Sequence, residues 1–201
     1  YMENNSSNKK KLKFKKIILT GAQGTGKTTL LNELSRVFDE NNTKIPVVTE
    51  VVRELALKKG LPINEDGCDE SQNNIFDSYY EIFSEKKSYL SDRGLTDVMA
   101  YTLDGYENEN VSIDCIERID KKFREFFKNP ENIKDSLYIF FPIEFKLVYD
   151  GVRSINKFYQ KRIDRLIKYY LKTCGIPEEN IMYISGSVPE RLKQVLDRVY
   201  E

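Results

Sequence analysis

Residues 21–34 read GAQGTGKTTLLNEL, and they directly follow the apolar run IILT at residues 17–20. A short β-type run that leads through a glycine-rich turn into a helix places the N–H groups of the turn around an anion. Leu30, Leu31 and Leu34 recur at the spacing of one helix face, so this helix has an apolar side to pack. The stretch therefore predicts a strand, a phosphate-binding loop and a helix, in that order.

Four positions of this turn, Gly21, Gly26, Lys27 and Thr28, match the P-loop motif. The glycines let the backbone curl around phosphate oxygens, Lys27 reaches the β- and γ-phosphates, and Thr28 can ligate Mg²⁺. The alternative is a glycine-rich turn without a ligand. We expect a nucleoside triphosphate to be bound by Gly21, Gly24, Thr25, Gly26, Lys27, Thr28 and Thr29.

Short β-type runs alternate with longer helical patterns along the rest of the chain. The β-type runs are residues 14–20, 44–49, 87–92, 136–141 and 180–185. The helical patterns are residues 27–40, 50–59, 69–86, 95–104, 111–128, 154–173 and 188–200. Such alternation indicates βαβ units. We therefore predict an α/β fold, a three-layer sandwich with a parallel five-stranded sheet and helices on both faces.

The composition limits the class of protein. The chain of 201 residues is 40% hydrophobic, which suits one domain with a single core. Its 32 basic and 32 acidic residues balance, so the net charge favours neither a nucleic-acid nor a membrane partner. The chain has no histidine, which leaves acid–base chemistry to Asp, Glu and Lys. Three widely separated cysteines and the lack of a long apolar stretch predict a cytoplasmic protein that spans no membrane.

The chain divides into two parts by composition. Residues 1–13 are rich in Asn, Ser and Lys, and we expect them to form a flexible basic arm. Residues 14–201 are expected to form a single P-loop domain. The oligomeric state cannot be predicted from these patterns.

Glu50 closes the second β-type run in the sequence VVTEVVREL. In an open α/β sheet, ligands bind beyond the carboxyl ends of the strands. A carboxylate there can accept the proton of a hydroxyl group as a phosphoryl group moves onto it, and Arg53, one turn later, can bind an anionic substrate. Alternatively, Glu50 stabilises the first turn of a helix through the macrodipole, and Arg53 is only its exposed partner.

The third β-type run ends in SDRGLTDVMAY, residues 91–101. Asp92, at the tip of a strand beside the P-loop strand, can hold Mg²⁺ together with Thr28, and Arg93 can neutralise phosphate charge. Asp97 lies one helical turn farther and can reach a substrate hydroxyl or amine. The alternatives are that Asp92 caps a helix beside a solvated Arg93, and that Asp97 has no part in the site.

Two further segments carry candidate residues. Asp150 and Gly151 interrupt the structure before Arg153, and residues 142–165 are expected to form a lid that brings Arg153 and Arg162 to the triphosphate. A solvated basic helix face is the alternative for Arg162. Ser187, in the sequence SGSVPE, can contact the base, although a capping box with Glu190 explains it equally well.

The order of these segments resembles a known family. GAQGTGKTTLLNEL, VVTEVVREL, SDRGLTDVMAY, DGVRS and ISGSVPERL are similar to segments of the AAA-type P-loop family that includes the ribosylnicotinamide kinase domain of bacterial NAD-biosynthesis regulators. The DR segment also resembles that of thymidylate and deoxynucleoside kinases. The resemblance implies a nucleoside-kinase-like fold with a central P-loop strand, and ATP with Mg²⁺ as the phosphoryl donor. It implies the roles given above for Lys27, Thr28, Glu50, Asp92, Arg93 and Arg153.

Three functions agree with these patterns. The first is an ATP- and Mg²⁺-dependent kinase that phosphorylates a nucleoside- or nucleotide-like small molecule. The second is a kinase of polynucleotide ends or modified bases, in which the basic run KKKLKFKK at residues 9–16 follows a phosphate backbone. The third is a regulatory NTPase or nucleotide-dependent binding module. The converging candidates Glu50, Asp92 and Arg93 favour the first, and a nucleic-acid partner is not favoured.

Overall fold

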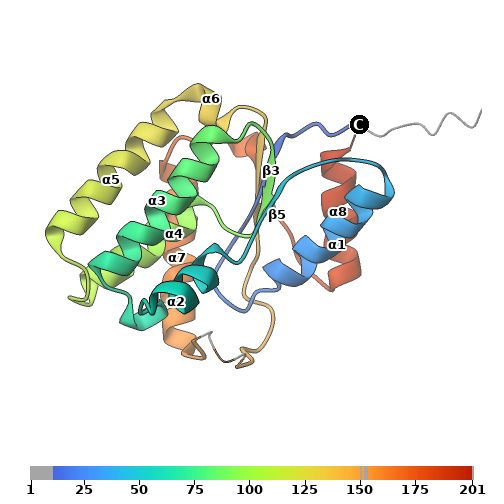
Figure 1. Ribbon diagram of the computed structural model, residues 1–201. Helices are drawn as coiled ribbons and strands as arrows, with labels where there is room; N and C mark the ends of the chain where they lie inside the picture. The colour runs from blue at the N-terminus through green and yellow to red at the C-terminus, as the bar shows by residue number, and fades with distance from the viewer. Residues whose placement is uncertain (1–10, 150, 152–153, 201) are drawn as a thin grey trace, which may run out of the picture.

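The computed structural model describes residues 11–149, 151 and 154–200. Its centre is a five-stranded parallel sheet in the order β2-β3-β1-β4-β5 (Figure 1). The strands are β1 (Lys16–Thr20), β2 (Val47–Val48), β3 (Tyr89–Ser91), β4 (Ser136–Phe140) and β5 (Ile181–Tyr183). The strand before the P-loop is thus the middle strand, and the strand that ends before Asp92 is its direct neighbour.

Every residue of β1 is buried, because helices cover both faces of the sheet. Ile17 and Leu19 face one layer of helices, and Ile18 between them faces the other. Ile18 lies in register with Ser91 of β3 and Tyr138 of β4. Apolar side chains at successive positions, rather than alternating apolar and polar ones, therefore mark β1 as a central strand of the parallel sheet.

The helices form two unequal layers, as Figure 1 shows. Helices α1 (Lys27–Glu40) and α8 (Val188–Val199) pack side by side on one face of the sheet. The other face is covered by α3 (Asp69–Glu85), α4 (Leu95–Glu107), α5 (Ile113–Lys128) and α7 (Lys157–Thr173). The remaining helical elements are α2 (Val51–Lys59), α6 (Pro130–Ile133), η1 (Asn64–Asp66) and η2 (Glu178–Asn180). This is the predicted three-layer α/β sandwich.

The predicted helices and strands lie within a few residues of the observed ones. The largest difference is β2, which has two paired residues where residues 44–49 were predicted. As an edge strand, β2 pairs only with β3, so fewer of its residues are held in the ladder. The short elements α6, η1 and η2 have no counterpart in the prediction, because one turn of helix contains too few residues for a periodic pattern.

Helix α7 contains the second half of the predicted lid, residues 157–165. Its side chains Tyr159, Ile163 and Ile167 are buried against the sheet and α4, whereas Lys161 and Arg165 are exposed. This segment therefore lies in the helix layer, because its apolar face is anchored in the core. Residues 142–149 and 154–156, from the first half of the predicted lid, contain no helix or strand.

Part of the predicted N-terminal arm is paired with the other end of the domain. Leu12 forms an antiparallel bridge with Tyr200, and the backbone N–H of Lys13 donates to the carbonyl oxygen of Val199 at 2.9 Å. These backbone contacts begin two residues before the domain start predicted at residue 14. Within the described residues, every helix is too short or too polar to cross a membrane.

Candidate active site

The P-loop joins β1 to α1 through backbone conformations that favour glycine. Gly21, Gly24 and Gly26 have φ angles of 144°, 74° and 92°. At Gly21 a Cβ atom would also lie 2.7 Å from the carbonyl oxygen of Phe141, which is too close for any side chain. Position 21 therefore needs glycine for two reasons. Its backbone has a positive φ angle, and the backbone of Phe141, directly after β4, lies too close for a side chain.

Lys27 folds back over this loop. Its Nζ atom donates to the carbonyl oxygens of Gly21 and Ala22, both at 2.7 Å, and lies 3.5 Å from Thr25 Oγ1. The next two residues, Thr28 and Thr29, are exposed at the N-terminus of α1. The ammonium group is thus fixed in the centre of the loop, and the hydroxyl of Thr28 is accessible to a ligand.

Glu50 lies between β2 and α2 in an unusual backbone conformation. Its φ angle is 61°, in the left-handed region that non-glycine residues rarely adopt. Such conformations cost free energy and occur preferentially where a side chain must be aimed at a site. The Glu50 carboxylate forms an ion pair with Arg53, with 3.2 Å between Oε2 and Nε.

Asp92 and Arg93 follow β3. Thr49 Oγ1 donates to Asp92 Oδ2 at 2.8 Å, whereas Asp92 Oδ1 is buried and has no hydrogen-bond partner among the described residues. The Arg93 guanidinium lies 4.9 Å from the ring centroid of Tyr101. Burial opposes its charged form, but Tyr101 and other neighbours raise the pKa of Arg93 above the ordinary value. Arg93 therefore remains a cation.

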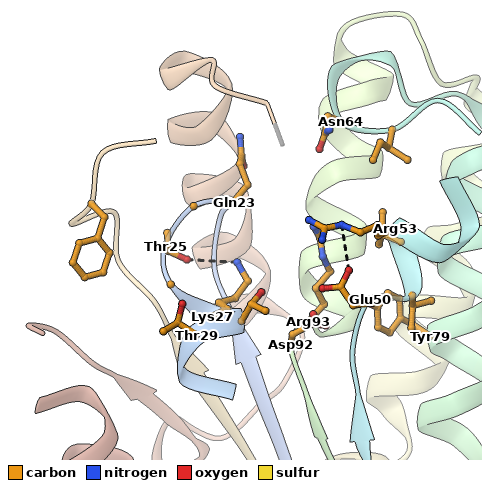
Figure 2. Close-up of a pocket in the computed structure, with 17 residues that line it drawn as sticks. Gln23, Thr25, Lys27, Thr29, Glu50, Arg53, Asn64, Tyr79, Asp92 and Arg93 are labelled. Carbon is orange, nitrogen blue, oxygen red and sulfur yellow. Dashed lines mark hydrogen bonds and ion pairs between the residues drawn. The ribbon is translucent and has the colours of Figure 1, made fainter. Parts of the chain in front are cut away.

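These residues surround one cavity of about 310 Å³. Gln23, Thr25, Lys27 and Thr29 lie on one wall in Figure 2, and Glu50, Arg53, Asn64 and Arg93 lie on the opposite wall. The order β2-β3-β1 explains this meeting, because it brings the carboxyl ends of three strands to the same edge. The predicted residues that line the cavity are Gly24, Thr25, Gly26, Lys27, Thr28, Thr29, Glu50, Arg53, Asp92 and Arg93.

Asp97 does not line this cavity, although the sequence suggested a substrate contact. Its fully buried carboxylate accepts hydrogen bonds from Thr20 Oγ1 at 2.6 Å and from the backbone N–H groups of Gly21 and Gly94, each at 3.0 Å. Burial raises the pKa of this carboxyl, and the charge of Lys27 opposes the rise. The contacts of Asp97 link α4 to the start of the P-loop.

Two other predicted residues also have partners away from the cavity. Arg162 on α7 donates from Nε to Asp104 Oδ1 on α4 at 2.7 Å. The backbone N–H of Ser187 donates to Glu190 Oε2 at 2.7 Å as part of the capping box of α8, and Ser187 Oγ donates to the same oxygen at 2.6 Å. Arg153 lies outside the described residues. The structure therefore brings Glu50, Asp92 and the P-loop together, but not Arg162 or Ser187.

Several residues of the cavity wall were not predicted. They are Gln23, Val51, Val52, Ile63, Asn64, Tyr79 and Phe145. Gln23 is the one with a sequence signal, since it lies inside the P-loop motif. Tyr79 belongs to the apolar face of α3, where an aromatic residue is usually part of the core. Burial raises the pKa of the Tyr79 phenol well above its ordinary value, so the hydroxyl stays neutral.

The donor atoms of the cavity fit a hard cation such as Mg²⁺. Asp92 offers the buried oxygen Oδ1, which has no partner among the described residues, and the hydroxyl of Thr28 lines the same cavity. No group of three or more His, Cys, Asp or Glu side chains suited to a metal occurs in the described part of the chain. Because Mg²⁺ is usually held by one or two protein oxygens together with phosphates and water, this sparse set is suitable.

The fold occurs in solved structures of low sequence identity to this chain. The deoxyadenosine kinase from M. mycoides, with products dCMP and dCDP bound, is 14% identical, with a TM-score of 0.63 over 91% of this chain and 97% of that chain. The NadR protein in complex with NR is 14% identical, with a TM-score of 0.64 over 92% of this chain and 50% of that one. This chain therefore spans about half the length of the NadR protein.

A third structure, the YorR protein from Bacillus subtilis in complex with phosphorylated GDP, is also 14% identical and has a TM-score of 0.52 over 90% of this chain and 93% of that chain. No protein of curated function matches the chain by sequence. The sequence profile of an AAA domain family matches residues 16–191, which include all five strands and the cavity. The chain therefore belongs to this AAA domain family, with the fold of the nucleoside-kinase-like P-loop proteins.

Proposed function

We propose that this protein is a kinase that transfers the γ-phosphoryl group of ATP, with Mg²⁺, to a nucleoside- or nucleotide-like small molecule. The observation that carries the proposal is the position of Glu50 on the cavity wall opposite Lys27 (Figure 2). A P-loop alone binds a nucleotide, whereas phosphoryl transfer also needs a group that accepts the proton of the attacking hydroxyl. The P-loop and the Glu50 carboxylate both line the cavity, which supports the proposal.

The P-loop wall would bind the donor. Backbone N–H groups of residues 21–28 and the N-terminus of α1 attract the phosphates, and Lys27 adds a positive charge at the centre of the loop. Thr28 and Asp92 would hold the metal ion, which supplies charge neutralisation at the β- and γ-phosphates when it is bound. Arg93 places a second fixed cation at the cavity for the negative charge of the transferring group.

The opposite wall would bind the acceptor. Glu50 takes the proton from the attacking hydroxyl, and its ion pair with Arg53 orients the carboxylate. Val52, Ile63 and Tyr79 form an apolar surface beside the amide of Asn64. An apolar surface with a few polar groups suits a flat base attached to a sugar. The deoxyadenosine kinase and the NadR complex with NR support a nucleoside-like acceptor by analogy of fold.

The test is transfer of label from γ-labelled ATP in the presence of Mg²⁺. Acceptors are nucleosides, nucleoside monophosphates, nicotinamide riboside and DNA or RNA with a 5′-hydroxyl, and Lys27→Ala is the control. Label on a small nucleoside-like acceptor that depends on Lys27 supports the proposal. Label on DNA or RNA instead identifies a polynucleotide kinase, and release of free phosphate alone identifies a regulatory NTPase.

A further inference from the structure

Phe145 is a large aromatic residue that lines the cavity beside the P-loop. It follows β4, and it retains 40% of its surface exposed, unlike the buried Phe140 and Phe141 just before it. Its ring edge is close to the P-loop, since a Cβ atom placed on Gly26 would lie 3.5 Å from Phe145 Cε2. An exposed aromatic ring therefore adjoins the loop that is expected to hold the phosphates.

The strand order places Phe145 on the donor side of the cavity. Glu50 and Asp92 follow β2 and β3, on one side of the central strand β1, whereas Phe145 follows β4 on the other side. The γ-phosphate must face the acceptor wall for transfer to occur. A triphosphate held by the P-loop therefore directs its sugar and base away from Glu50, toward the side of the loop where Phe145 lies.

The ring of Phe145 is held by Arg191 of α8. The Arg191 guanidinium lies 4.6 Å from the ring centroid, and Arg191 is 1% exposed. Its nitrogen atoms donate to the carbonyl oxygens of Thr25 at 2.7 Å and Gly186 at 2.9 Å, and to Glu144 Oε2 at 2.5 Å. With its donors bound in three directions, this guanidinium forms a rigid support that ties the aromatic ring to the P-loop.

We propose that Phe145, supported by Arg191, stacks on the aromatic base of the donor nucleotide. This inference rests on the proposed function, since it assumes that the P-loop holds a nucleoside triphosphate. It replaces the predicted base contact of Ser187, whose hydroxyl donates to Glu190 instead. Stacking on an aromatic ring tolerates any base because every base has a π-face. The stacking contact therefore suits the base of either ATP or GTP. Its contribution to the binding affinity comes from the base rather than from the phosphates.

The test compares ligands with and without a base. Dissociation constants of ATP, GTP and inorganic tripolyphosphate, each with Mg²⁺, are measured by calorimetry for the full chain and for Phe145→Ala and Phe145→Tyr. Phe158→Ala is the matched control, because Phe158 is 78% exposed on α7 and does not line the cavity. Circular dichroism of each variant verifies the fold.

We expect Phe145→Ala to weaken ATP and GTP by about tenfold and to change tripolyphosphate by less than about twofold. Phe145→Tyr, which keeps the ring, retains the affinity for ATP, and Phe158→Ala has no effect. Equal losses for ATP and tripolyphosphate, or an unchanged ATP affinity, overturn the stacking role while the proposed kinase function stands. A wild-type protein that binds neither ATP nor GTP overturns both.

Discussion

The Oε2 atom of Glu50 lies 3.2 Å from the Nε atom of Arg53, one turn farther along α2, and both side chains face the cavity that also contains Lys27. About a third or more of each side chain is exposed, 37% for Glu50 and 43% for Arg53. A pair this open is worth little as a stabilising ion pair. The position of the pair at the cavity and the left-handed backbone of Glu50 support the proposed role of Glu50 at the acceptor.

Glu50→Gln should lower the rate of phosphoryl transfer by about 10²- to 10⁴-fold, the usual contribution of a general base. The affinity for ATP should change little, since Glu50 faces the acceptor. Transfer kinetics and calorimetry with ATP measure the two effects. Glu54→Gln on the same helix, which breaks an exposed pair with Lys58, is the control. An unchanged rate in Glu50→Gln would remove this residue as the base.

Lys27→Ala should abolish transfer and weaken the binding of both ATP and tripolyphosphate, because the loop loses its central cation. We expect the rate to fall by about 10²-fold or more. The fold should persist, as circular dichroism would show, since the core clusters contain none of the atoms that are removed. The control is Lys193→Ala, which removes one exposed lysine from α8. Persisting transfer would contradict the predicted role.

Removal of divalent metal with EDTA should stop transfer, and added Mg²⁺ should restore it. Asp92→Asn should raise the Mg²⁺ concentration needed for half-maximal rate, because a neutral amide is a weaker ligand than a carboxylate. The control is Asp120→Asn, which removes an exposed partner of Arg124 on α5. A Mg²⁺ dependence that is the same in Asp92→Asn and the wild type would show that Asp92 does not hold the ion.

Asp97→Ala should lower the free energy of unfolding by about 1–3 kcal/mol, because Thr20 and two backbone N–H groups lose their acceptor. The pH dependence has a defined sign. Burial raises the pKa of Asp97, so the folded state binds this proton more tightly than the unfolded chain. Its contribution to stability is therefore full below the ordinary pKa of 3.8 and falls as the pH rises through the raised value.

Asp97→Asn isolates this effect, since it keeps the shape of the side chain and removes the titration. Urea unfolding of the wild type and of Asp97→Asn between about pH 4 and 7 measures the difference in slope. We expect the stability of the wild type to fall relative to the variant as the pH rises. Parallel curves would show that the pKa of Asp97 is not raised in the folded protein.

The fold could be predicted from the sequence because its signals are local. The P-loop motif between an apolar run and a helix, and the alternation of β-type and helical segments, indicated the parallel sheet and its two helix layers. The same rule about strand ends located Glu50 and Asp92, which follow β2 and β3 and meet at the cavity. In an α/β sheet, position at a strand end largely determines position in space.

Residues within helices and at their ends were harder to place. Asp97, Arg162 and Ser187 carry functional groups that could bind a ligand. Successive side chains on a helix point about 100° apart, so an error of one residue decides whether such a group faces the cavity, the core or its own helix end. Phe145 and Arg191 were missed for another reason. Their roles depend on contacts between β4, α8 and the P-loop, which no local pattern records.

The bond from Arg191 Nη1 to the carbonyl oxygen of Thr25 joins residues 166 positions apart. During synthesis at about 5–20 residues per second, on the order of ten seconds passes between the emergence of Thr25 and that of Arg191. The phosphate loop therefore leaves the ribosome well before the side chain that completes this contact. If the proposed nucleotide site requires this completed loop, a nucleotide stabilises the fold only after α8 has been made.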